Sequence, residues 1–146
     1  MNNFEPALSQ ALILSDLVIT EVGTNKSSLI GCFTCLNAPK FPFATPLFYV
    51  TALVTNIRGK VEQLVVTLRI EDERSGHVSA SVSANVGLPP DAPAFVPAQI
   101  FQVSLPVPPF QVQTAGEYSV LILVNNMQAG KRSLEIRPLT QQAPPS

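Results

Sequence analysis

The residues best suited to chemistry are two cysteines three positions apart, Cys32 and Cys35, and a single histidine, His77. A Cys-x-x-Cys pair supports redox chemistry when it begins a helix, whereas the surrounding Ile-Gly-Cys-Phe-Thr-Cys-Leu is typical of a strand. On an extended strand, residues three positions apart point to opposite faces of the sheet, and their Cα atoms are about 10 Å apart. That distance is too long for a disulfide. We therefore expect two unpaired thiols in a reducing compartment.

The chain also has few residues that could bind a metal ion or act in acid–base catalysis. A zinc site with three protein ligands would need Cys32, Cys35 and His77 all to converge, and a four-ligand Cys/His site cannot be completed. The carboxylates of residues 71–73 lie on a predicted turn and lack the interleaved oxygen spacing of a calcium loop. His77 follows that turn on an outward row of polar residues, so we expect it at the surface. A Ser-His-Asp arrangement would need the histidine in a cleft. The sequence predicts no catalytic residue, no metal site and no cofactor, and hence a protein that is not an enzyme.

Length and charge narrow the function classes further. The chain has 146 residues, enough for one domain, which we place at residues 1–140 with a disordered tail at 141–146. Charged residues make up 13% of it and the net charge is −1, so no field of one sign would gather nucleic acid or a membrane surface. No apolar run approaches the ~18 residues of a spanning helix, and no basic residue precedes the apolar residues 11–14 as in a signal peptide. We expect a cytoplasmic protein.

The dominant hydrophobic period is two, which indicates strands with one buried face. Residues 63–71 are the clearest case, with an apolar row on one side and polar residues on the other, and residues 77–84 alternate again after a Ser-Gly turn. The same reasoning predicts further strands at residues 9–21, 27–36, 46–55, 99–105, 117–124 and 131–137. About eight short strands with proline-rich connections predict an all-β sandwich.

One short motif distinguishes between types of sandwich. The segment Thr-Ala-Gly-Glu-Tyr-Ser-Val at residues 114–120 resembles the opening of strand F in immunoglobulin-like domains, where a tyrosine hydroxyl folds back onto the backbone. Gly116 and Tyr118 would form this structural corner, and Val120 stands where the second cysteine of the inter-sheet disulfide is usual. The resemblance implies an immunoglobulin-like antiparallel β-sandwich. A simple turn followed by an aromatic strand residue would give the same letters.

A second resemblance covers most of the chain. The stretches Ala-Leu-Ile-Leu-Ser-Asp at residues 11–16, Lys-Ser-Ser-Leu-Ile-Gly-Cys-Phe at 26–33 and Pro-Lys-Phe-Pro at 39–42, together with the closing hairpin at residues 117–137, are similar to a family of uncharacterised bacterial proteins. Members of that family commonly open with Ala-Leu-Leu-Cys-Asp, so Ser15 stands where a cysteine is expected. The resemblance implies a fold and a bacterial origin, and it leaves the function open. Asp16, which interrupts an apolar strand, is expected to satisfy backbone N–H groups or a cation.

Two predicted strands carry apolar residues on both rows. Within residues 46–55 the row opposite the expected core still carries large apolar side chains, and the same holds for residues 117–124. If these segments are strands C and F of an immunoglobulin-like sheet, they lie side by side. Their outer residues would then merge into one interface patch made of Leu47, Tyr49, Leu53, Leu121 and Leu123. Covering each side chain is worth roughly 1.5 to 3 kcal/mol; the alternative is that the loop at residues 87–97 covers them.

These observations predict a non-enzymatic module that works through protein contact, with either a protein partner or further copies of itself. The alternative is a small-ligand or carbohydrate-binding module that uses the proline-rich rim loops. In that case the aromatic side chains of the loops would form a platform, made of Phe41, Phe43, Phe95 and Phe110.

Overall fold

The computed structural model describes residues 5–8 and 12–139, and in this part of the chain every regular element is a strand. The expected tail at residues 141–146 lies outside the described residues. Twelve strands are formed where about eight were expected, because several of them are only two to four residues long. The strands are β1 (Ala7–Leu8), β2 (Ile13–Thr20), β3 (Ser27–Phe33), β4 (Cys35–Ala38), β5 (Phe43–Ala44), β6 (Phe48–Thr55), β7 (Gln63–Asp72), β8 (Val78–Gly87), β9 (Phe101–Val107), β10 (Gln111–Val112), β11 (Gly116–Val124) and β12 (Met127–Pro138).

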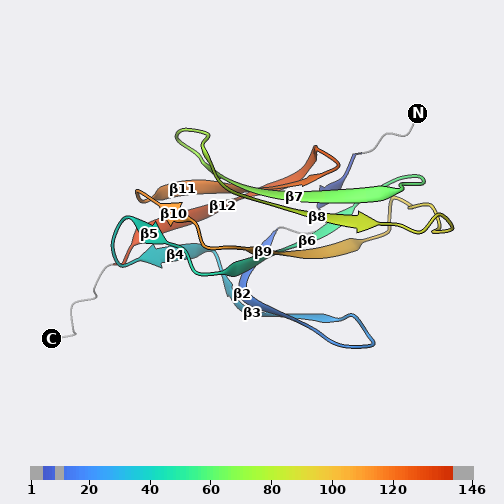
Figure 1. Ribbon diagram of the computed structural model, residues 1–146, viewed down its shortest axis with the longest axis horizontal. Helices are drawn as coiled ribbons and strands as arrows, with labels where there is room; N and C mark the ends of the chain where they lie inside the picture. The colour runs from blue at the N-terminus through green and yellow to red at the C-terminus, as the bar shows by residue number, and fades with distance from the viewer. Residues whose placement is uncertain (1–4, 9–11, 140–146) are drawn as a thin grey trace.

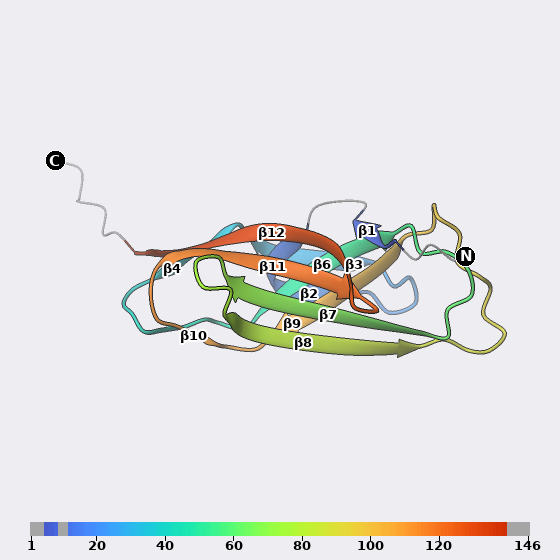
Figure 2. The same cartoon turned by 90° about the horizontal axis from the view of Figure 1, so that it is seen from above.

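The long strands form two layers, as Figure 1 shows. In the first sheet β6 is central, with β9 along one edge and β1 and β2 along the other, and β3 continues outward from β2. The second sheet has the order β4-β12-β11-β7-β8, whose four longest strands lie side by side in Figure 2. If β2, β6 and β9 are strands A, B and E, then β7, β11 and β12 are C, F and G, the division of strands found in immunoglobulin-like domains. The expected all-β sandwich is confirmed.

The core lies between the two sheets and is formed by the rows that the alternation predicts. In β7, Leu64, Val66, Leu68 and Ile70 are each at most 1% exposed. The rows of β6 and β11 that face them are also buried and belong to the same cluster, which includes Phe48, Val50, Ala52, Val54, Tyr118, Val120, Ile122 and Val124. Burial of this much apolar side-chain area between two sheets is the main term that stabilises the sandwich.

The expected corner at the start of β11 is present. The Tyr118 hydroxyl donates a hydrogen bond to the Thr114 carbonyl oxygen at 3.3 Å, and the side chain is 3% exposed. The Arg74 guanidinium lies over Gly116, and a Cβ at this position would be 3.1 Å from its Cζ. Burial raises the pKa of Tyr118, because the phenolate would lose its hydration.

Two sequence expectations about the strands were wrong. Residues 27–36 are not one strand, because the ladder breaks at Thr34 and the chain passes from β3 in the first sheet to β4 in the second. There β4 pairs in parallel with β12, with Cys35 opposite Glu135. Residues 46–55 are not strand C, because β6 lies in the sheet opposite β11. Alternation of side chains predicts a strand but carries no information about its neighbours in a sheet.

The loop at residues 87–97 closes one end of the sandwich instead of covering an outer face. Phe95 and Gly59 exchange two backbone hydrogen bonds of 2.8 and 3.1 Å, and Phe95 packs on the core. Phe110 is 9% exposed at the other end, where the short pair β5–β10 brings Phe43 onto the core with Phe41. The four phenylalanines therefore contribute to two ends of the core. The single aromatic platform expected under the alternative function is not formed.

Candidate interaction surface

The most distinctive surface belongs to the hairpin formed by β2 and β3. β2 pairs with β6 only through Ile13, Leu14 and Ser15, whereas its pairing with β3 continues to Thr20. Beyond Ser15 the hairpin is therefore a ribbon of two strands, which extends below the sandwich in Figure 1. An isolated two-stranded ribbon is marginally stable in water, so its contacts on either face decide whether it holds its shape.

The hairpin bends where Asp16 faces Gly31. Gly31 has φ +70°, a left-handed conformation that glycine adopts without steric cost. The Asp16 carboxylate lies directly over it, and a Cβ at position 31 would collide with that carboxylate. Asp16 thus occupies the space that a side chain on β3 would need, and among the described residues it forms no ion pair. This bend directs the rest of the hairpin across the outer face of the first sheet.

The outward face of the hairpin is apolar and exposed. Leu17 and Ile30 are directly opposite each other in the ladder, and Ile19 follows two residues after Leu17 on the same face. Their exposed fractions are 44% for Leu17, 47% for Ile30 and 49% for Ile19, and Val22 at the tip is 97% exposed. We call Leu17, Ile19 and Ile30 the outer stripe. Three large aliphatic side chains grouped in this way form an exposed patch of the kind that marks interaction sites.

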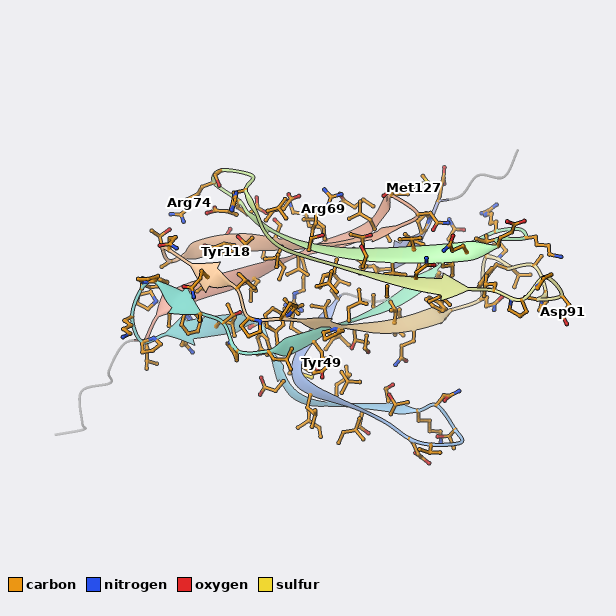
Figure 3. The ribbon with its side chains drawn as sticks, in the orientation of Figure 1. Tyr49, Arg69, Arg74, Asp91, Tyr118 and Met127 are labelled. Carbon is orange, nitrogen blue, oxygen red and sulfur yellow. The ribbon has the colours of Figure 1, made fainter. Side chains whose placement is uncertain are left out.

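The inward face of the hairpin lies against the sandwich. Val18 and Leu29 on this face are half-buried. Closer to the tip a polar hollow of about 450 Å³ separates the hairpin from β9 and is lined by Thr20, Asn25, Ser27, Gln102 and Ser104. Figure 3 shows Tyr49 where the hairpin leaves the sandwich. The inward face is therefore partly covered by the chain itself, whereas the members of the outer stripe stay 44–49% exposed.

The single patch expected from the sequence is not formed. Leu47 is 49% exposed, and Tyr49 and Leu53 are half-buried on the outer face of the first sheet. Leu121 and Leu123 lie on β11 in the second sheet, on the opposite side of the molecule. β6 is apolar on both rows because one row faces the core and the hairpin shields part of the other.

The outer face of β11 is also less exposed than expected. Leu123 is 9% exposed, and Leu121 is half-buried between Arg69 on β7 and Lys131 on β12, which are its ladder partners. Long basic side chains cover apolar neighbours with their methylene groups while the charge stays in water. Both leucines are thus largely covered by their own sheet, and neither contributes to a broad apolar surface.

A polar cleft lies at the corner end of the molecule. It has a volume of about 340 Å³ and is lined by Asp72, His77, Ser79, Gln111, Gln113, Thr114 and Tyr118. Figure 3 places Arg74 and Tyr118 at this end, opposite Asp91. The Arg74 backbone N–H donates to Asp72 Oδ1 at 2.9 Å and lowers the pKa of that carboxyl group. The Arg74 guanidinium also donates to the Thr114 hydroxyl at 2.6 Å.

The other residues singled out from the sequence stay apart. Cys32 is exposed on β3, Cys35 is half-buried on β4, and neither forms a disulfide, as expected. His77 is exposed, as expected. Within residues 5–8 and 12–139 no group of three or more potential ligands gathers around a metal position, and this part of the chain contains no helix long and apolar enough to cross a membrane.

Sequence reasoning missed the outer stripe, although its signal was present. Leu17, Val18 and Ile19 follow one another, as do Leu29 and Ile30, so both rows of this hairpin are apolar. Residues 46–55 and 117–124 carry the same signal of apolar side chains on both rows. A hairpin with two apolar faces either lies inside a sheet stack or presents one face to a partner.

Comparison with known proteins gives a family and a fold. A protein-family model described as a family of unknown function (DUF6941) matches residues 10–137. None of the curated protein sequences matches this chain. Among solved structures, alkylpurine DNA glycosylase AlkC from Pseudomonas fluorescens, bound to DNA with an abasic site analog, is similar with 16% identity and a TM-score of 0.45. That match covers 92% of this chain and 31% of AlkC, so this chain spans about a third of its length.

An immunoglobulin-like protein from Pseudomonas aeruginosa is similar with 12% identity and a TM-score of 0.36. The match covers 91% of this chain and 97% of that protein. The immunoglobulin-like strand order of this chain rests on the paired strands described above, and neither structural neighbour adds a function to it.

Proposed function

We propose, for a chain that belongs to the family of unknown function DUF6941, that it is a non-enzymatic assembly module of the bacterial cytoplasm that contacts another protein through the β2–β3 hairpin. The family resemblance expected from residues 11–42 is confirmed, and its description assigns no activity. The observation that supports the proposal is the outer stripe, whose three members are each 44–49% exposed on one face of a two-stranded ribbon.

Two features of the hairpin favour its association with a partner. Leaving a large aliphatic side chain in water forgoes up to roughly 1.5–3 kcal/mol relative to full burial, and the stripe leaves nearly half of each of its side chains exposed. A two-stranded ribbon also gains stability from any further layer or strand placed against it. A partner that covers the hairpin satisfies both needs at once. The low charge of the chain, with a net charge of −1, leaves little repulsion to oppose association.

The proposal is tested by photo-crosslinking in living bacterial cells of the source species. A benzoylphenylalanine in place of Ile19 probes the outer stripe, and the same residue in place of Ser81 probes the polar outer row of β8 as the matched control, since both positions are exposed. We expect one discrete adduct from position 19 and none from position 81. Adding Leu17→Asp should reduce the adduct at least tenfold while circular dichroism remains unchanged. Absence of an adduct at position 19, or the same adducts from both positions, would overturn the proposal.

Binding of a small polar ligand is the second candidate function, and the cleft beside Tyr118 favours it. Gln111 and Gln113 project exposed amides at this cleft next to His77 and Ser79, and amides and hydroxyls of this kind bind sugars and similar polar molecules. A glycan array tests it directly. Binding by the native chain that is lost in Gln113→Leu would establish this function, whereas an array without any binder would remove it.

A further inference from the structure

The open edge of β3 indicates which kind of partner the hairpin binds. Among residues 5–8 and 12–139, β3 is the last strand of its sheet, and no described strand lies beside its other edge. Its residues carry no charge and include no proline. Natural sheets usually protect an open edge with charged residues, proline or a covering loop. The β3 edge lacks the first two of these protections along its whole length.

The hydrogen bonds of the hairpin show which groups of β3 point outward. The Glu21 N–H donates to the Lys26 carbonyl oxygen at 2.8 Å, so this pair is hydrogen-bonded across the ladder. In an antiparallel ladder every second residue repeats that arrangement, and Ser28 and Ile30 therefore direct their backbone groups toward β2. Ser27 and Leu29 direct their N–H and C=O groups to the open edge, where another strand would be needed to pair them. The left-handed φ of +70° at Gly31 interrupts this alternation.

We propose that two copies of this chain join edge to edge through antiparallel β3 strands, with the two-fold axis passing between the two Ile30 side chains. The inference rests on the proposed function, since it identifies the partner as a second copy. Ile30 is the central residue of β3, so this register overlaps the full length of both strands. It sets the outward-directed Leu29 opposite Gly31 of the other copy and Ser27 opposite Phe33, so the bend at Gly31 lies beside Leu29 of the other copy on each side of the axis.

The register also organises the outer stripe. Leu17 lies opposite Ile30 in each hairpin, so the four-stranded sheet carries an unbroken row of four aliphatic side chains, Leu17 and Ile30 from one copy followed by Ile30 and Leu17 from the other. Neighbouring side chains in such a row lie in contact across the strands. Antiparallel pairing also places the two Lys26 residues at opposite ends of the new sheet, whereas parallel pairing would place them side by side.

The other uncharged edge of the molecule fits less well. β8 is also an edge strand, but it belongs to a wide sheet packed on the core. Its outward row is mostly polar, with Ser81, Ser83 and Asn85, and carries one exposed aliphatic residue, Val78, at its beginning. A strand added there would meet one aliphatic side chain on this row, whereas the β2–β3 hairpin offers the grouped side chains of the outer stripe.

Disulfide trapping tests the register in purified protein in which both natural cysteines are replaced, Cys32→Ser and Cys35→Ser. Ile30→Cys places two thiols across the axis at a non-hydrogen-bonded pair, where Cα atoms are about 4.5 Å apart and a disulfide forms readily. Ser28→Cys is the matched control on the same strand and face, because its nearest neighbour across the axis is residue 32. Ser81→Cys is the control for the β8 edge. All three positions are exposed, so the fold should tolerate each change.

We expect covalent dimer from Ile30→Cys on mild oxidation and monomer from both controls. Restoring Cys32 beside Ser28→Cys should then produce dimer, because these two residues face each other across the axis. In the native chain, hydrogen exchange should show protection of the Leu29 amide that rises at least tenfold with protein concentration, with no such change at Ile30. Monomer from Ile30→Cys without concentration-dependent protection would overturn the inference, as would equal trapping of Ser28→Cys.

The two proposals fail in different ways. If purified chain stays monomeric while position 19 is crosslinked in cells to a protein of another mass, the assembly function stands and pairing of two copies is wrong. If the crosslinking at position 19 also yields nothing, both are wrong.

Discussion

A single buried hydroxyl allows a sharp test of how the first sheet is stabilised. Ser15 is 0% exposed, and its Oγ forms no hydrogen bond with any described residue. An unpaired hydroxyl taken out of water costs about 1–3 kcal/mol in proteins. Ser15→Ala removes that cost and leaves only a small void. We therefore expect the free energy of unfolding to rise by about 1 kcal/mol, which corresponds to an increase in Tm of about 3 °C for a domain of this size.

Ser119 is the matched control, because it is 3% exposed and its hydroxyl donates to the Glu73 carboxylate. Ser119→Ala should lose about 1.5 kcal/mol, as expected for a hydrogen bond to a charged acceptor. Ser15→Cys should behave like Ser15→Ala, because a buried thiol acts as a small apolar group. Urea unfolding measures all three, with the midpoint shifting and the slope constant. Loss of stability in Ser15→Ala as large as in Ser119→Ala would refute the reasoning.

Three further changes probe the backbone and the corner. Gly130→Ala should cost about 1–3 kcal/mol, because a Cβ there collides with the Leu8 side chain, and Leu8→Ala should restore part of the loss in urea unfolding. Tyr118→Phe should cost about 1 kcal/mol at neutral pH by removing the bond to Thr114. Since burial raises the Tyr118 pKa above its ordinary 10.0, this contribution is complete below pH 10 and declines as the pH rises further, so unfolding curves of the two proteins should converge in alkali. Asn126→Ala should cost about 1 kcal/mol, since Asn126 has φ 66°, whereas Asn126→Gly should cost nothing in the same assay.

The sequence predicts the elements of this fold better than their arrangement. The buried row of β7 and the corner at Tyr118 follow from local patterns, because alternation and a turn with a fixed offset involve only neighbours in the chain. The sheet to which β6 belongs depends on partners some fifty residues away, and no periodicity within residues 46–55 encodes them. The bend at Gly31 is likewise invisible in the alternation, although it decides which face of the hairpin meets solvent.

The candidate site shows the same limit. Leu121 and Leu123 are outward-facing by alternation, as predicted, but the neighbouring strands that cover them come from β7 and β12. Exposure is a property of the assembled sheets. The sequence shows only that both rows of the β2–β3 hairpin are apolar, as both rows of β6 are. The three-dimensional order of the strands is needed to show that the exposed row is the one on the hairpin.

The crossover at Thr34 has a consequence for synthesis on the ribosome. β4 leaves the first sheet to lie beside β12, and Cys35 meets Glu135, a residue made about 100 positions later. At roughly 5–20 residues per second the early strand waits on the order of 5–20 s for its only ladder partner in that sheet. During this interval β4 lacks its partner in that sheet, so the pace of translation sets how long the strand stays unpaired.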